Sequence, residues 1–130
     1  MFYRKLSLKE WAFSNDARIG QNKLNKASDA ESLGVERKVS STGKYIYKVL
    51  NQDEIKKAGK LYRDASICFH KACEKAERKN ETELVDGYSD KENHCINKSK
   101  LMITLYFAGD KDKIKSFDWN LSIDYKPMLC

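Results

Sequence analysis

An apolar stripe in residues 51–79 constrains the fold of this 130-residue chain more than any other feature. Asn51 is a favourable N-cap residue, Glu54 stands three positions later, and Leu50 and Ile55 occupy the positions of a hydrophobic staple. Apolar residues then recur at alternating spacings of three and four, namely Ile55, Ala58, Tyr62, Ala65, Phe69, Ala72 and Ala76. This spacing predicts one long helix over residues 51–79, and some other element must cover its apolar face.

The C-terminal sequence predicts the element that covers the long helix. Apolar residues alternate with others over 101–107 and again over 117–125, and Gly109 to Lys113 have the composition of a turn. Residues 99–126 are therefore expected to form an antiparallel β-hairpin whose apolar side packs on the helix. Residues 80–98 lack a clear period and are expected to form a loop. A second copy of the long helix is the alternative cover, which would make a homodimer.

Two short helices and a hairpin are predicted before the long helix. Ser7 and Glu10 match a capping box, which predicts a helix from about Leu8 to Ser14. A second helix is expected from about Asp16 to Ala27, reaching Leu33 unless a separate short helix begins at Ser28. Residues 35–39 and 45–50 are rich in β-branched and aromatic residues and flank a Ser-Ser-Thr-Gly turn, which indicates a β-hairpin.

These elements predict an α+β fold in a single domain over residues 1–130. Its expected parts are a unit of helices and a hairpin (1–50), a long central helix (51–79), a loop (80–98) and a C-terminal hairpin (99–126). One proline and six glycines leave no linker typical of a second domain. The N-terminus becomes polar too early for a signal peptide, and no stretch approaches the roughly 20 apolar residues of a membrane span. A cytoplasmic protein without membrane contact is expected, and in that compartment its four cysteines would stay reduced.

Positive charge is concentrated in the first part of the chain. Residues 1–60 contain 13 Lys and Arg against 7 Asp and Glu, whereas residues 61–130 contain 12 of each kind. A local excess of positive charge is typical of a surface that binds a polyanion. Nucleic acid is therefore the first partner that the sequence predicts.

The order helix, helix, hairpin over residues 7–50 resembles a winged helix-turn-helix, in particular the small DNA-binding domains of phage antirepressor-type proteins. The resemblance rests on the segments 23–26, 33–38 and 43–47, the last of which would be the wing. It departs from that pattern in a longer spacing between the first two segments and in Asp29 and Glu31, which would repel phosphate. The resemblance implies a DNA-binding regulatory protein of phage or mobile-element type.

If this interpretation holds, side-chain chemistry assigns the roles. Gln21, Asn22 and Asn25 carry the paired donor and acceptor that can read an adenine edge, and Arg18 could read a guanine. The remaining candidates would neutralise phosphates from the helix and the wing, and they are Lys23, Lys26, Arg37, Lys38, Lys44 and Lys48. The alternative is that all ten belong to ordinary solvated faces.

Five potential metal ligands cluster in the second half of the chain, namely Cys68, His70, Cys73, His94 and Cys95. Their irregular spacing differs from the two close pairs of a structural zinc site, so Cys68 and Cys73 are expected to pack beside the stripe as small apolar residues and His70 to be exposed. A cysteine nucleophile would need a neighbouring histidine base, and nothing in the surrounding sequence indicates one. Phosphate-loop, nucleophile-elbow and metalloprotease motifs are also missing from the sequence. The chain is therefore expected to act without a cofactor and not as an enzyme.

A protein-interaction module is the competing hypothesis. Seven tyrosines, two tryptophans and the small size of the chain are typical of inhibitors that block a host enzyme or a defence complex. The distribution of Lys and Arg in space separates the two hypotheses. A basic stripe on the helix and the wing favours nucleic acid, whereas a flat aromatic patch favours a protein partner.

Overall fold

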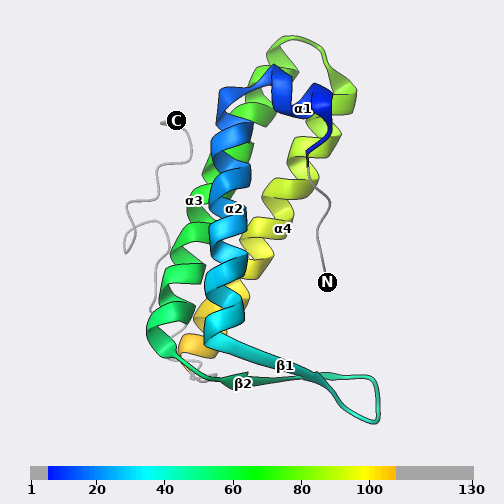
Figure 1. The fold of residues 1–130 in the computed structure, drawn as a ribbon. Helices are drawn as coiled ribbons and strands as arrows, with labels where there is room; N and C mark the ends of the chain where they lie inside the picture. Colours follow the sequence, from blue (N-terminus) through cyan, green and yellow to red (C-terminus); the bar gives the residue numbers. More distant parts are fainter. Residues whose placement is uncertain (1–5, 108–130) are drawn as a thin grey trace.

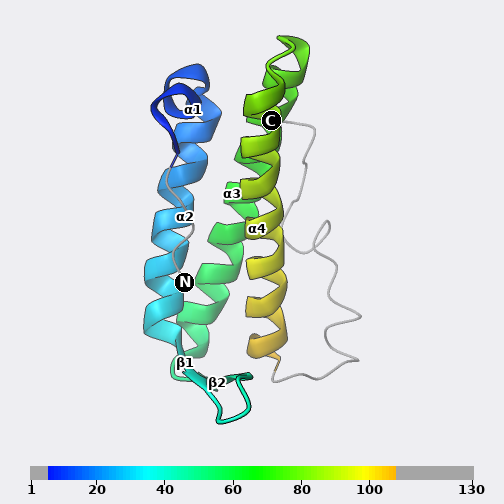
Figure 2. The ribbon, with the colours of Figure 1, turned by 90° about the vertical axis from the view of Figure 1, so that its right-hand side faces the viewer.

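The computed structural model describes residues 6–107, which form a three-helix bundle with a short N-terminal helix and a projecting β-hairpin (Figure 1). Helix α3 packs on both α2 and α4 and runs antiparallel to both; it lies partly behind α2 in Figure 1 and between the other two helices in Figure 2. The elements in chain order are α1 (Leu8–Phe13), α2 (Asn15–Gly34), β1 (Val35–Val39), β2 (Tyr45–Val49), α3 (Gln52–Arg78) and α4 (Thr82–Tyr106).

The first two helices begin at serine caps. The Glu10 backbone N–H donates to Ser7 Oγ at 3.1 Å, and the Ser7 backbone N–H donates to Glu10 Oε1 at 2.9 Å, so the predicted capping box is confirmed. Ser14 separates α1 from α2, and its Oγ accepts a hydrogen bond from the Ala17 backbone N–H at 3.2 Å. Helix α2 continues without a break to Gly34, so no separate short helix begins at Ser28.

The first hairpin is confirmed at the predicted position. Strands β1 and β2 pair antiparallel, with Val35 opposite Val49 and Val39 opposite Tyr45. The Ser40 N–H donates to the Lys44 carbonyl at 2.7 Å, and the Gly43 N–H donates to the Ser40 carbonyl at 2.9 Å. Gly43 has a φ of 82°, a left-handed conformation that suits glycine. A tight polar turn therefore closes the hairpin.

The predicted long helix is confirmed, and its stripe forms the centre of the core. Asn51 Oδ1 accepts hydrogen bonds from the backbone N–H groups of Asp53 and Glu54, as expected for an N-cap. All seven stripe residues from Ile55 to Ala76 are at most 2% exposed. Helices α2 and α4 of the same chain cover this stripe, so the fold does not require the second copy that was the alternative cover.

Helix α4 contradicts the predicted α+β class. Residues 82–106 form one helix, where the sequence pattern predicted a loop followed by a strand, so the described part of the chain is mostly helical. The buried positions of α4 do recur with a helical period. They include the polar residues Lys91 and Ser99, however, so a search for apolar residues alone does not detect this period. The predicted strand over 101–107 is therefore wrong, and residues 117–125 lie outside the described residues.

Glu31 of α2 links the three long helices. One carboxylate oxygen accepts a hydrogen bond from the Tyr62 hydroxyl of α3, and the other accepts one from Lys98 Nζ of α4 at 2.9 Å. Burial, together with the adjacent Glu31 carboxylate, raises the pKa of Tyr62 far above its ordinary value. The tyrosine hydroxyl therefore stays protonated and continues to donate to Glu31.

None of the helices within residues 6–107 contains an apolar run of the length that a lipid bilayer requires.

Candidate nucleic-acid interface

The hairpin is fixed at the end of the bundle where α2 stops and α3 starts. The backbone N–H groups of Leu50 and Asn51 donate to the Gly34 carbonyl at 2.8 and 3.2 Å. Val35 is 8% exposed, and Tyr47 packs against the core as a half-buried side chain. The base of the hairpin is therefore anchored in the bundle, while its turn projects away from it (Figure 1).

Four of the ten predicted site residues lie together on this hairpin with exposed side chains, and they are Arg37, Lys38, Lys44 and Lys48. The Lys38 ammonium lies 3.6 Å from a carboxylate oxygen of Glu36, and the lysine side chain is still 69% exposed. An ion pair this exposed is weak, so it leaves Lys38 able to contact an external anion.

Three further lysines belong to the same end of the molecule, although the sequence interpretation did not include them in the site. Lys56, Lys57 and Lys60 are exposed on the first turns of α3, immediately after the hairpin. Lys60 follows Lys57 by three residues and Lys56 by four, which places the three lysines on one side of a helix. This spacing is the sequence signal that could have identified them. Residues 35–60, here called the basic end, contain seven Lys and Arg against three Asp and Glu.

Two of the predicted base-reading residues are engaged inside the molecule. Arg18 donates from Nη1 to the Trp11 carbonyl at 2.7 Å and from Nη2 to Asn15 Oδ1 at 3.3 Å. Gln21 is 7% exposed and donates from Nε2 to Asn25 Oδ1 at 2.9 Å. These side chains hold α1 on α2 or fill the bundle, so they are not placed to read a base edge.

The other α2 candidates lie apart from the hairpin. Asn22, Asn25 and Lys26 are exposed, and Lys23 is half-buried beside Cys68 of α3. Lys26 precedes Gly34 by eight residues, which corresponds to about 12 Å along a helix. The structure therefore does not combine the ten predicted residues into one continuous surface, and the four hairpin residues are the members of the set that lie together.

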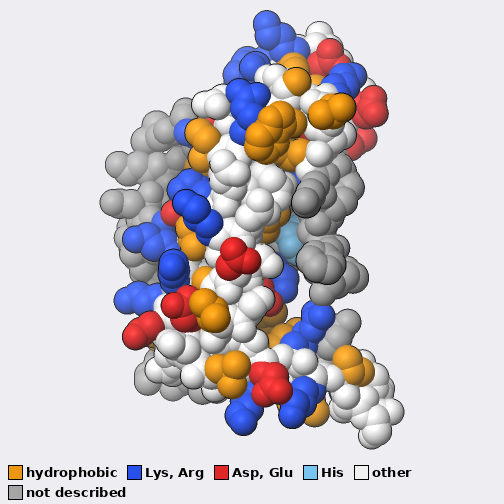
Figure 3. Space-filling view, in the orientation of Figure 1, with side chains coloured by type: hydrophobic (Ala, Val, Ile, Leu, Met, Phe, Trp, Pro, Cys, Tyr) orange, Lys and Arg blue, Asp and Glu red, His pale blue; other side chains and the backbone are white. Residues whose placement is uncertain are grey.

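Negative charge gathers toward the opposite end. Residues 74–93, which span the end of α3 and the start of α4, contain seven Asp and Glu against four Lys and Arg. In Figure 3 acidic side chains gather at the upper right, near the connection between α3 and α4, with basic side chains beside them, and side chains of both signs also lie along the lower edge. The two segments therefore differ in charge balance, and each carries side chains of both signs.

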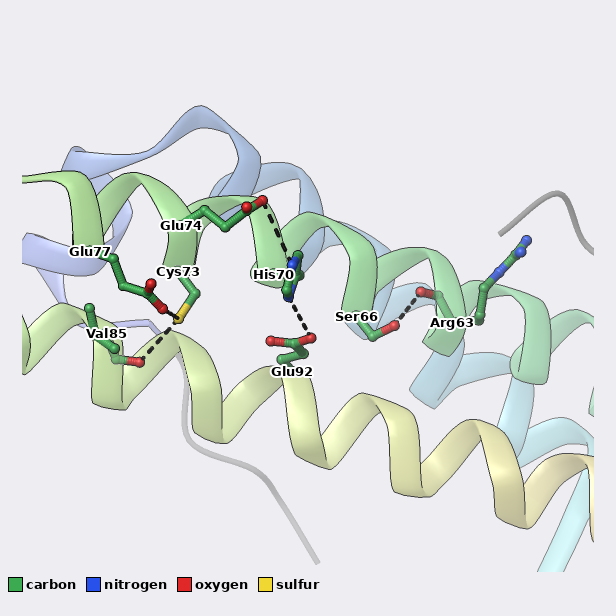
Figure 4. A network of polar contacts seen from close by, with 8 residues as sticks. All are labelled: Arg63, Ser66, His70, Cys73, Glu74, Glu77, Val85 and Glu92. Carbon is green, nitrogen blue, oxygen red and sulfur yellow. Dashed lines mark hydrogen bonds and ion pairs between the residues drawn. The ribbon is translucent and has the colours of Figure 1, made fainter. Parts of the chain in front are cut away.

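The histidine and cysteine cluster makes a contact between α3 and α4 (Figure 4). His70 Nδ1 lies 2.9 Å from Glu92 Oε2 of α4, and His70 Nε2 lies 3.7 Å from Glu74 Oε1 on its own helix. Burial raises the pKa of the Glu92 carboxyl, and the neighbouring His70 partly opposes that shift. The imidazole thus occupies the space between two carboxylates.

Cys73 has the surroundings of a structural thiol. Its Sγ lies 3.7 Å from Glu77 Oε1 and 3.7 Å from the Val85 carbonyl oxygen (Figure 4). Burial and the nearby Glu77 carboxylate raise its pKa to about 11, and burial raises the pKa of Cys95 to about 12. A reactive cysteine needs a lowered pKa, so these surroundings do not favour a nucleophile.

The potential metal ligands do not converge. His94 is half-buried on α4, and burial together with Lys98 and Lys91 lowers its pKa. His70 instead lies against Glu74 and Glu92. Across residues 6–107, no group of three or more His, Cys, Asp or Glu side chains is arranged to hold a metal ion.

Comparison of the chain with family models, with curated proteins and with solved structures found no match.

Proposed function

We propose that this protein binds nucleic acid through its basic end, in a regulatory role. The observation that carries the proposal is that the exposed hairpin lysines and the exposed Lys56, Lys57 and Lys60 all belong to the end of the bundle where α2 stops and α3 starts. The hairpin would supply the phosphate contacts, since Arg18 and Gln21 of α2 are engaged in other contacts.

Electrostatics supports this proposal. Seven basic residues in a segment with three acidic ones create a local field, and each cation placed on a phosphate releases a condensed counterion. The acidic residues of 74–93 lie away from the basic end, so they would orient an approaching polyanion toward the hairpin. The lysines of the hairpin are exposed, so binding requires no prior rearrangement of their side chains.

A salt series with two matched variants tests the proposal. The purified protein is titrated against a labelled random DNA duplex between about 50 and 200 mM salt, beside Lys38→Gln/Lys44→Gln and the control Arg78→Gln/Lys79→Gln. Both double variants remove two exposed positive charges, but the control pair lies at the other end of α3. The hairpin variant should reduce the slope of log K against log salt by about 1.8, since each phosphate contact contributes about 0.9. The control should keep the slope of the unchanged protein.

The second candidate function is inhibition of a host protein or a defence complex. Its supporting observation is a group of exposed aliphatic side chains at the same end, comprising Leu33, Val39, Ile46, Val49 and Leu50. Such side chains could dock on an apolar surface, although they do not form the flat aromatic patch typical of many protein interfaces. Absence of binding to any nucleic acid at about 50 mM salt would contradict the first proposal and favour this one.

A further inference from the structure

The two faces of the hairpin differ in their surroundings. Residues directly opposite each other in an antiparallel pair share a face, and faces alternate along each strand. Val35 is buried and Tyr47 packs on the core, so their face is the inner one at the base. The other face, here called the outer face, therefore carries Glu36, Lys38, Ile46 and Lys48.

Ile46 is an apolar side chain within a cationic setting. It is 56% exposed, lies directly opposite Lys38, and precedes Lys48 by two residues on the same face. Glu36 stands opposite Lys48 and 3.6 Å from the Lys38 ammonium, so its charge is balanced within the face. An exposed isoleucine gains free energy when a ligand covers it, and lysines on both sides favour an anionic ligand.

The shape of the hairpin selects among nucleic acids. A two-stranded ribbon fits the major groove of B-DNA, which is about 12 Å wide and about 8.5 Å deep. The major groove of duplex RNA is too deep and narrow for side chains to read. Proteins that bind single strands stack bases on aromatic side chains, and the four outer-face positions include none.

We propose that the outer face of the hairpin enters the major groove of duplex DNA. Lys38 and Lys48 contact the phosphates that border the groove, and the Ile46 side chain packs on the 5-methyl group of a thymine. This inference rests on the proposed nucleic-acid function and adds the ligand class and a specificity-determining residue. Thymine is the natural base for such a contact because it alone presents a methyl group in the groove.

The test compares two DNA pools that differ only in this methyl group. A duplex pool of random sequence is prepared once with thymidine and once with deoxyuridine, and the affinity of the full-length protein for each is measured. Loss of one buried methyl contact is expected to weaken binding about two- to fourfold. Ile46→Ala should remove the difference between the pools, and Lys38→Gln/Lys44→Gln should weaken binding to both pools equally. Val39→Ala, which shortens an exposed side chain on the inner face, is the matched control and should keep the preference for thymidine.

The outcomes separate this inference from the function on which it rests. Equal affinity for the two pools, with binding still dependent on Lys38 and Lys44, would overturn the thymine contact and leave the function standing. Tighter binding to duplex RNA or to single-stranded DNA than to duplex DNA would overturn the major-groove assignment. Failure to bind any nucleic acid would overturn the function and the inference together. Circular dichroism of Ile46→Ala checks that the exposed substitution leaves the fold intact.

Discussion

Gly34 lies at the point where α2, the hairpin and α3 meet, and its substitution by alanine should destabilise the fold. A Cβ atom at position 34 would lie 2.9 Å from Ile55 Cγ1, 3.0 Å from the Ile55 backbone nitrogen and 3.1 Å from the Asn51 carbonyl oxygen. Two of these three neighbours are backbone atoms of the first turn of α3, so they cannot move as a side-chain end can. The Gly34 carbonyl also holds Leu50 and Asn51. Gly34→Ala therefore forces α2 and α3 apart where the hairpin is anchored.

The expected loss of stability is the difference between two opposing effects of the added methyl group. Forcing an extra carbon into a well-packed site costs about 1–3 kcal/mol. Alanine gains at most about 1 kcal/mol over glycine in a helix, and less at the last residue of α2. The net loss in the free energy of unfolding is thus about 1–2 kcal/mol. For a chain of this length that corresponds to a decrease in Tm of about 4–10 °C.

Thermal unfolding followed by circular dichroism measures this difference, with Gly59→Ala as the matched control. A Cβ at position 59 would meet one atom, Met102 Cβ, at 3.2 Å, so this contact requires a shift of only a few tenths of an ångström and is less severe than the three contacts at position 34. The control should therefore lie within about 1 kcal/mol of the unchanged protein, since helix propensity compensates for a small strain. A Gly34→Ala protein with a Tm equal to or above that of the unchanged chain would refute the close approach described here.

Two further predictions concern titratable groups of the α3–α4 contact and the core. Burial is the main cause that raises the pKa of Glu92 above its ordinary 4.5, so the folded state favours the protonated carboxyl. The stability of the unchanged protein should therefore fall, relative to that of Glu92→Gln, as pH rises above 4.5. Urea unfolding of both proteins at pH 4, 5.5 and 7 measures this, and a stability difference independent of pH would contradict it. Cys73 and Cys95, with pKa values of about 11 and 12, should resist iodoacetamide at pH 8 until the protein is unfolded. Mass spectrometry of the labelled protein provides the measurement, and rapid alkylation of either thiol in the folded state would show that the site is open.

Local signals in the sequence predicted the first four elements and the start of α3. Capping at Ser7 and Asn51, the Ser-Ser-Thr-Gly turn and the stripe from Ile55 to Ala76 each depend on neighbours a few residues away, so the sequence alone contains them. The exposure of the four hairpin cations was predictable for the same reason, because a short polar-tipped hairpin cannot bury them. Lys56, Lys57 and Lys60 lay within the basic segment, and their helical spacing would have added them to the site.

Helix α4 could not be predicted from apolar spacing because tertiary contacts decide which of its residues are buried. Leu101 and Ile103 alternate with neighbours in the way a strand does, yet Met102 and Ile103 are both buried against the bundle. Buried Lys91 and Ser99 complete a helical face that contains polar residues. A sequence pattern ranks residues by polarity, whereas burial in this helix depends on what α3 places opposite each position.

The sequence by itself determined the local elements, the caps that begin them and the excess of positive charge in the first 60 residues. The tertiary structure decided which of those charges are exposed at one end of the bundle. Arg18 bonds to the Trp11 carbonyl because α1 lies beside α2, and Gln21 is buried and bonds to Asn25, whereas the hairpin and the start of α3 belong to one end of the bundle because Leu50 and Asn51 are held by the Gly34 carbonyl. The face that a helix shows to solvent depends on the elements packed around it, and no spacing within one helix specifies those neighbours.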